Sequence, residues 1–382
     1  MHFPDQQQRA YRAWITVLVT LALAGAWCYL RQLNMGLGLT GLSRDVTWGL
    51  YIGQFTFADG LAASAAILVL LSAVHGSRSF RKLVLYGQIL AIASAIACML
   101  FVVADLGQPS LLWNVLLHPS PVSIMFWDVV VLAGYLAITA LIVTVTINCE
   151  RKDLPPPRWL RPVAVLSIPW AIGMQTVSAF LYCGLPGRSM WLSAILAPRF
   201  IVSAFASGTA LLVLVLRFAR VRLESETLRK ARTLIAYTMA LNLFFLLLEV
   251  FTTLYSRIPE PIDHYQASAP WIWISGTLAA TSLALLNGFR RNERLLPVAC
   301  AFTVASVWIE KGFALVPSGF VPSPLGVVTT YTPTVPEILI AAGIWAVSAL
   351  IATLLFRTAF AVRSYNGEKP YLLSVEQEIL IR

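Results

Sequence analysis

Charge is scarce in this sequence. Only 12% of its 382 residues are Asp, Glu, Lys or Arg, about half of the share found in soluble domains. Hydrophobic residues make up 58%, and the mean hydropathy is +0.75. This composition excludes an ordinary soluble domain and predicts an integral membrane protein.

Residues that commonly hold redox cofactors are also few. The five cysteines are scattered, with neither a CxxC nor a CxxCH pattern: Cys28, Cys98, Cys149, Cys183 and Cys300. The four histidines lie at the N-terminus or in expected loops: His2, His75, His118 and His264. We therefore expect no iron–sulfur cluster and no haem in this chain. Any redox role then requires a partner subunit that carries the electrons.

Long apolar runs recur along the whole chain. A helix needs about 20 apolar residues to cross the hydrocarbon core of a bilayer. The runs are continuously apolar and Leu/Ala-rich, which favours helices over the alternating strands of a barrel. We predict an all-α, single transmembrane domain over residues 1–382 with ten spans, at 14–30, 48–74, 83–104, 124–148, 163–181, 195–218, 234–255, 270–289, 295–315 and 338–360.

The net charge of +10 is distributed in a way that predicts orientation. Basic residues concentrate in alternate loops, as the positive-inside rule requires of cytoplasmic segments, so we do not expect a nucleic-acid partner. The few on the opposite side are Arg31, Arg44, Arg188, Arg199, Arg257 and Lys311. This pattern places the N- and C-termini in the cytoplasm.

A weak internal repeat relates the second and sixth spans. Phe57–Gly60 and Phe205–Gly208 have similar sequences 148 residues apart. Because the two spans run in the same direction, we predict two four-helix bundles, spans two to five and six to nine. The approximate halves are residues 45–185 and 195–316, followed by span ten and a cytoplasmic tail over 335–382. Small residues such as Gly60 and Ser64 are expected to let helices approach closely.

Several ionisable residues lie inside or at the ends of the predicted spans. Such residues cost roughly 2.5–3.5 kcal/mol each on insertion at a helix centre, so they are functional candidates. The set is Asp59, Asp105, Asp128, Arg199, Glu249, Glu310, Lys311 and Glu337. The alternative is that they sit at the headgroup level, or that Glu249 or Glu310 pairs with Arg199 or Lys311 to hold helices together. Asp59, near mid-membrane, is the hardest to explain in this way.

A protonatable pocket that is reached from the bilayer suits a quinone. Its apolar tail needs lipid access, while its carbonyl groups need hydrogen-bond donors and a nearby acid or base. His118 with Asp105 or Asp128 is a reasonable acid–base pair, because a carboxylate can orient an imidazole. The alternative is a solvated loop histidine.

Three segments carry a resemblance to a known family. They are Trp48–Phe55 leading to Gly60, Asp105–Pro109, and His118–Pro121 followed by Met125–Asp128. Together they resemble the NrfD/PsrC family of polysulfide-reductase-like membrane subunits. The ten spans, Trp308–Lys311 and the Pro-rich 322–336 segment are most similar to its DsrP/HmcC branch, found in DsrMKJOP-type complexes.

This resemblance implies a multi-pass subunit of a prokaryotic cytoplasmic membrane. It implies electron exchange between menaquinone and an extracytoplasmic ferredoxin-like iron–sulfur subunit (DsrO-like), with further redox subunits including cytochromes, in dissimilatory sulfur metabolism. Asp105, His118 and Asp128 match protonatable catalytic positions of the family. Quinone contacts carry over to Trp48, Gln54 and Glu249.

Proton movement through the bundle is a further expectation, with Asp59, Gln88 and Glu249 lining an inward path. Two alternatives to the redox function stay open. A secondary transporter would also have a repeat and mid-membrane acids, although only Pro169 in the fifth span hints at the broken helices expected there. The other alternative is a structural anchor, in which the acids serve only as interhelical pairs.

Overall fold

The fold is described from a computed structural model of residues 5–74, 78–185, 187–219, 221, 223–256, 259–288, 294–320 and 331–365. Residues 366–382, most of the predicted cytoplasmic tail, and 321–330 of the Pro-rich loop lie outside these ranges. The described ranges contain helices and no strands. Ten of their helical segments are long and apolar enough to cross a membrane, which confirms the ten predicted spans.

The helices extend several residues beyond most of the predicted spans, because apolarity marks only the part in lipid. Their bounds are α1 Asp5–Met35, α2 Leu50–Ala63, α3 Ala65–Val74, α4 Arg78–Asp105, α5 Asn114–Leu117, α6 Ile124–Arg151, α7 Leu160–Cys183, α8 Leu196–Phe218, α9 Ser225–Ser256, α10 Pro259–Gly288, α11 Leu295–Ile309 and α12 Val335–Tyr365. Short 3₁₀ turns join several of them: η1 Leu37–Leu39, η2 Pro109–Trp113, η3 Ser189–Trp191 and η5 Pro317–Phe320.

Two of the ten spans depart from a regular α-helix. The second is divided at Ser64 into α2 and α3, and the Ser64 hydroxyl donates to the Leu61 carbonyl 2.7 Å away. This bond competes with the helical hydrogen-bond ladder. The ninth ends in a π-helical turn, η4 (Glu310–Leu315). Single π turns occur frequently at functional sites, and here the turn carries both Glu310 and Lys311.

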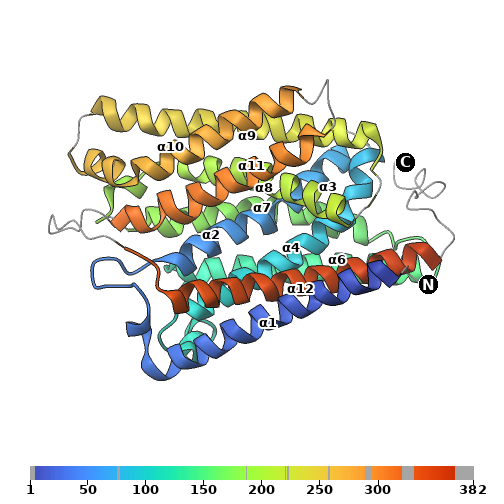
Figure 1. Cartoon of the computed structure of the whole chain (residues 1–382), viewed down its shortest axis with the longest axis horizontal. Coiled ribbons are helices and arrows are strands. Elements are labelled where there is room, and N and C mark those ends of the chain that lie inside the picture. The colour runs from blue at the N-terminus through green and yellow to red at the C-terminus, as the bar shows by residue number, and fades with distance from the viewer. Residues whose placement is uncertain are drawn as a thin grey trace.

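Contacts between elements arrange the spans in two rings of four. In the first ring α2 packs on α4, α4 on α6, α6 on α7, and α7 on α2. In the second, α8 packs on α9, α9 on α10, α10 on α11, and α11 on α8. The long helices α1 and α12 lie side by side along one flank of the molecule (Figure 1). Helix α12 packs on α4, and α1 bonds to the end of α4 through Gln32, which donates to the Ala104 carbonyl at 2.7 Å.

The two rings meet where α2 packs against α8. A Cβ atom added at Gly208 would overlap the Ser64 side chain, and one added at Gly60 would lie 3.5 Å from Ala204. The prediction that Gly60 and Ser64 allow close helix approach is therefore confirmed. This seam brings the middle of α2 next to the second ring.

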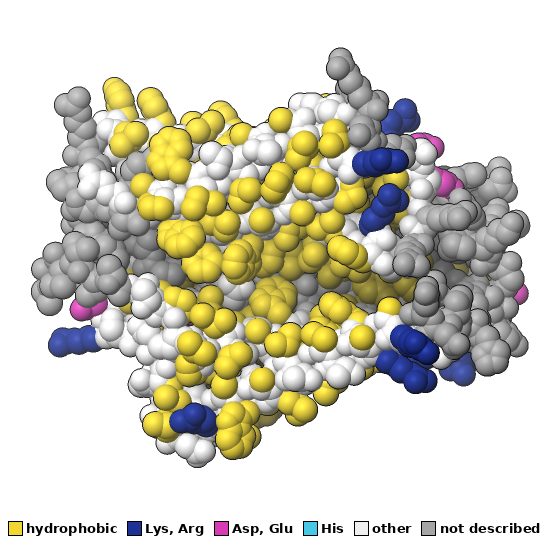
Figure 2. Space-filling view, in the orientation of Figure 1, with side chains coloured by type: hydrophobic (Ala, Val, Ile, Leu, Met, Phe, Trp, Pro, Cys, Tyr) yellow, Lys and Arg dark blue, Asp and Glu magenta, His cyan; other side chains and the backbone are white. Residues whose placement is uncertain are grey.

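Apolar side chains cover the outer surface between the two ends of the bundle (Figure 2). Large ones such as Leu23, Trp27 and Leu247 are more than half exposed, as expected of side chains that face lipid rather than a core. Figure 2 shows more Lys and Arg side chains at the end where α1 begins and α12 ends than at the opposite end. The cytoplasmic placement of the termini stays a prediction.

Glu337 organises the end opposite the termini. Its carboxylate accepts hydrogen bonds from the backbone N–H groups of Gly41 and Thr334 and from the Tyr331 hydroxyl, at 2.7–2.8 Å. Tyr331 in turn accepts from the Leu50 N–H at the start of α2. Burial, together with the nearby Glu337 carboxylate, raises the pKa of Tyr331, so its hydroxyl stays a donor. Glu337 thus ties the segment before α12 to the segment before α2.

Candidate functional site

Two buried carboxylates of the first ring are held by one helix. Asp59 of α2 accepts a hydrogen bond from Gln175 of α7. Asp128 of α6 accepts one from Ser178 of α7 at 2.8 Å. Because Gln175 and Ser178 lie three residues apart, they project from the same face of α7. The structure therefore brings Asp59 and Asp128, predicted for different roles, into one polar cluster within an apolar bundle.

An aromatic cluster lies at the end of α7. Trp48 stacks on Trp191 with ring centroids 6.0 Å apart and contacts Tyr182 and Phe320 edge-on. The Tyr182 hydroxyl bonds to Thr56 of α2. Trp48 is half-buried, at the end of the first ring where α2 begins and α7 ends.

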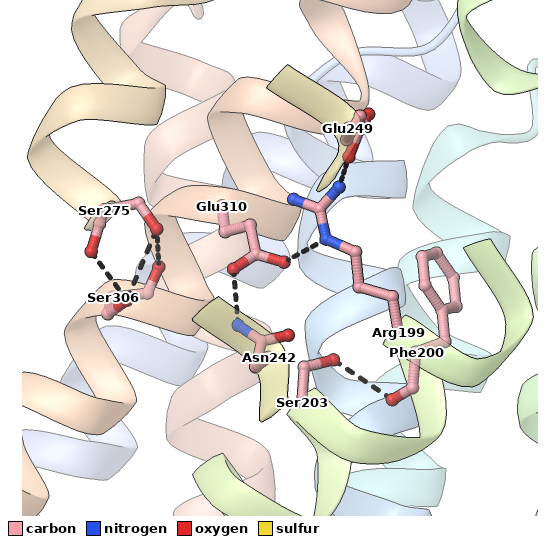
Figure 3. A network of polar contacts seen from close by, with 8 residues as sticks. All are labelled: Arg199, Phe200, Ser203, Asn242, Glu249, Ser275, Ser306 and Glu310. Atoms are coloured by element: carbon pink, nitrogen blue, oxygen red, sulfur yellow. Dashed lines mark hydrogen bonds and ion pairs between the residues drawn. The ribbon is translucent and has the colours of Figure 1, made fainter. Parts of the chain in front are cut away.

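The second ring contains an ion-pair network centred on Arg199 of α8 (Figure 3). The Arg199 Nε donates to Glu310 Oε1 at 2.9 Å, and its Nη1 pairs with Glu249 of α9. Asn242 of α9 donates to the other Glu310 oxygen at 2.8 Å. Both glutamates thus pair with Arg199, one of the two cations named for them above. Next to it, Ser275 and Ser306 bond α10 to α11.

A small cavity of about 20 Å³, large enough for about one water molecule, adjoins this network. Its polar lining is Arg199, Glu249, Glu310 and Thr253, and the rest is mainly apolar, including Leu246 and Ile272. The Glu249 side chain is 20% exposed, against 7% for Arg199. Glu249 is thus the member of the network most open to the surroundings.

Lys311 occupies an unusual position between the two rings. It is only 2% exposed, and its ammonium makes no hydrogen bond with any described residue. The ammonium lies 4.5 Å from the centre of the Phe200 ring. The alternative in which Lys311 pairs with Glu249 or Glu310 is not formed in the described structure, because the π turn directs its side chain inward.

Gln54 and Gln88 differ in how well they are bonded. The Gln54 side-chain oxygen accepts from the indole N–H groups of Trp308 and Trp345, at 2.8 and 2.9 Å. The Gln88 side chain is completely buried, and neither of its polar atoms has a hydrogen-bond partner among the described residues. Buried amides without partners are rare and costly. No hydrogen bond connects Gln88 with Asp59 or Glu249 in the described structure.

Asp105 and His118 lie near the same end of the molecule but are not joined. Asp105 ends α4, is half-buried, and has one carboxylate oxygen without a partner in the described structure. His118 follows α5 and is exposed. Within the described ranges no hydrogen bond or ion pair links His118 to Asp105 or Asp128. The expected acid–base pair is thus not formed here.

The predicted quinone contacts are also separated. Trp48 belongs to the aromatic cluster, Gln54 bonds two tryptophans between α11 and α12, and Glu249 lines the cavity of the second ring. Sequence reasoning missed Gln175, Asn242 and Tyr182 as partners of the buried groups. Their polarity inside apolar spans was the available signal. Among the described residues no group of three or more His, Cys, Asp or Glu could hold a metal ion.

Comparison with known proteins gives the family. The family model described as "Polysulphide reductase, NrfD" matches residues 38–323, which cover both rings. The chain belongs to this NrfD family. The multi-pass membrane placement and the resemblance read from the sequence are thereby confirmed.

Curated relatives of this NrfD-family chain belong to reductases and oxidoreductases. It is 26% identical, over 89% of each chain, to the putative membrane C subunit of dimethyl sulfoxide reductase from Halobacterium salinarum. It is 24% identical, over 89% of this chain and 91% of the relative, to the Hdr-like menaquinol oxidoreductase integral membrane subunit of Archaeoglobus fulgidus. It is 24% identical, over 66% of this chain and 67% of the relative, to the C subunit of selenate reductase from Mesobacillus selenatarsenatis.

Proposed function

We propose that this chain is the quinone-reactive membrane subunit of a respiratory redox complex. It exchanges electrons between menaquinone and an extracytoplasmic ferredoxin-like iron–sulfur partner, and the complex contains further redox subunits such as cytochromes. Support comes from the family and from a relative described as a menaquinol oxidoreductase subunit. A DsrO-like partner and a place in dissimilatory sulfur metabolism rest on the resemblance to the DsrP/HmcC branch.

The observation that carries this proposal is the incomplete bonding of Asp105. Its unpartnered carboxylate oxygen is buried, and we propose that it accepts a hydrogen bond from a quinol hydroxyl once the head group is bound. The half-buried Trp48 ring beside Tyr182 offers an apolar, aromatic wall at the same end of the first ring. Asp105 and the aromatic cluster thus supply an acceptor and an apolar wall, the two kinds of group that a quinone head group needs. When bound, the quinone supplies the two-electron chemistry.

The roles of the chain's own residues follow from their positions. Asp105 holds the head group and accepts its proton, and exposed His118 passes that proton towards water. Asp128, which accepts a hydrogen bond from Ser178, takes the second proton. Asp59 accepts from Gln175 on the same face of α7, so the two acids lie beside each other. Movement of that proton further inward along Asp59 and Gln88 is part of the proposal.

Substitution of each acid by Asn tests these roles. In Asp128→Asn the side-chain amide oxygen still accepts the Ser178 hydrogen bond, so assembly is expected to persist, while the loss of general acid–base function lowers quinol turnover roughly 100-fold. The same is expected of Asp105→Asn. The matched control is Asp153→Asn, because Asp153 is exposed and has a positive φ of 52° that Asn tolerates. Undiminished turnover in both site variants would remove these acids from the mechanism.

One observation favours the alternative that this chain is a structural anchor. Arg199 ties α8 to α9 and to η4 through two carboxylates, as an interhelical clamp would. An anchor, however, needs no quinone. Purified complex that assembles normally and yet neither binds nor oxidises menaquinol analogues would favour the anchor.

A further inference from the structure

The Lys311 ammonium lies between two sets of acidic residues. It faces the Gly60 backbone of α2, where an added Cβ atom would lie 3.0 Å from Nζ. Lys311 also directly follows Glu310 in the sequence of the η4 turn. The charged groups that act on it are Asp59 of α2, Glu310 and Arg199, and the Cys98 thiol of α4 lies near.

The contact between α2 and η4 is tight at two points. Gly60 faces the Lys311 ammonium, and at Gly53 an added Cβ atom would lie 2.6 Å from the Gly312 carbonyl oxygen. Positions seven residues apart project from the same side of a helix. One side of α2 is therefore shaped to receive the π turn, which fixes the Lys311 ammonium against Gly60, the residue that follows Asp59.

The charges of the combined cluster do not balance. Four carboxylates, of Asp59, Asp128, Glu249 and Glu310, accompany two cations, Arg199 and Lys311. Five of the six residues are less than 9% exposed, and Glu249 opens to the cavity. Uncompensated charge is strongly disfavoured in a low-dielectric interior, and bound protons remove it. A cluster with two more acids than bases therefore has the capacity to hold protons.

We propose that Lys311 transfers protons between Asp59 of the first ring and the Arg199–Glu310 network of the second, with the cavity at Glu249 as the opening of this route. The inference rests on the proposed quinone function, which supplies the driving reaction. In the described structure Lys311, Glu310 and Arg199 make no hydrogen bond or ion pair with Asp105, His118 or Asp128. The route therefore concerns proton movement and not the quinone chemistry itself.

Each step moves one proton and no electrons. An N–H bond of the Lys311 ammonium breaks and an O–H bond forms on the Asp59 carboxylate, which leaves a neutral amine and a neutral acid. Glu310, which first gains a proton from water through Glu249, then returns one to the amine, and Asp59 becomes a carboxylate again when it releases its proton further inward. The ammonium has no hydrogen-bond partner among the described residues, so it is free to turn from Gly60 towards Asp59 or towards Glu310.

The test compares proton movement with electron transfer in the whole complex. In proteoliposomes, quinol-driven turnover and protons moved per electron are measured together for wild type, Lys311→Met and Lys311→Arg. We expect Lys311→Met to reduce the proton-to-electron ratio to the value set by quinol oxidation alone. Quinol oxidation measured with an uncoupler present, so that no proton gradient opposes it, should stay within about twofold of wild type. Lys311→Arg, which keeps the charge but does not release its proton, should behave like Lys311→Met.

Two further variants separate this role from a structural one. Gly60→Ala keeps every ionisable group but pushes on Nζ, so it should lower the same ratio even if Lys311→Met fails to assemble. Arg232→Met removes another buried cation, one that donates to the Leu286 carbonyl at 2.9 Å outside this cluster. It should leave the ratio unchanged. A wild-type ratio in both Lys311→Met and Gly60→Ala, or a wild type that moves no protons beyond those of quinol oxidation, overturns the inference.

A second measurement keeps this inference distinct from the proposed function. The wild-type chain alone in liposomes is exposed to a potassium diffusion potential, and proton uptake is followed with an internal pH dye. If the complex does not oxidise quinol, the proposed function fails. Potential-driven uptake by wild type that is lost in Lys311→Met would still support the role of Lys311, and equal uptake by the two would overturn it.

Discussion

At the scale of single residues, Arg199 is the cation that pairs with both glutamates of the second-ring network. It bonds carboxylates from α9 and η4, and Asn242 completes the coordination of Glu310. A buried ion pair is not by itself strong evidence of stability, but removing one partner is costly because it leaves uncompensated charge. This asymmetry makes Arg199 the residue at which a substitution is most informative about stability.

Arg199→Met should therefore destabilise the second ring. The expected loss is about 3–5 kcal/mol, because two buried carboxylates lose their counter-ion. The melting temperature of the detergent-purified protein would show it as a clear decrease. Lys230→Met is the control, since Lys230 pairs with Glu226 at an exposed surface, at 2.7 Å, and such pairs contribute about 0.2–0.5 kcal/mol. Equal melting temperatures for the two variants would contradict this account.

Single residues also show what could and could not be predicted from the sequence. The buried acids could be identified, because charge inside an apolar run is conspicuous. Their partners could not be chosen, because Arg199 had two candidate glutamates and Lys311 had the same ones. Only the π turn of η4 decides that Glu310 faces Arg199 while Lys311 turns towards α2.

At the scale of elements, the packing of α2 on α8 joins the two rings. Ser64 and Gly208 meet at this crossing. In lipid, helices associate mainly through close van der Waals contact, so a methyl group at the crossing forces them apart. The break of the second span at Ser64 lies at the same point, which was not predictable from a continuously apolar sequence.

Gly208→Ala tests this crossing. The added Cβ would overlap Ser64, so the variant should melt at a lower temperature than wild type despite the better helix propensity of Ala. Gly173→Ala is the matched control in α7, because nothing lies within 4 Å of its added Cβ. It should be neutral or gain up to about 1 kcal/mol. A stabilised Gly208→Ala variant would show that the helices are not in close contact there.

At the scale of the whole molecule, the number of spans and their positions could be predicted from hydropathy alone. The prediction succeeded because every span must satisfy the same length requirement. The rotation of each helix about its own axis could not be predicted, because spans that are apolar on all sides show little periodicity. For this reason Trp48, Gln54 and Glu249, expected around one ligand, lie in three different places.

Orientation is a property of the whole molecule that charge predicts. The basic loops lie on the side of both termini, so a reporter active only in the cytoplasm should be active when fused to either end. A reporter that is active only outside the cytoplasm should stay silent at both. The opposite pattern of reporter activity would mean that the bundle is inserted the other way round, with Asp105 and Glu337 on the cytoplasmic side.

The most direct test of the proposed function is a menaquinol titration of the complex purified in mild detergent. The redox state of whatever iron–sulfur or haem centres co-purify is followed as menaquinol analogues are added. We expect quinol-dependent reduction that is lost in the Asp105→Asn and Asp128→Asn complexes and retained with Asp153→Asn. Isolation of the chain without redox partners and without any response to quinol would contradict the proposal.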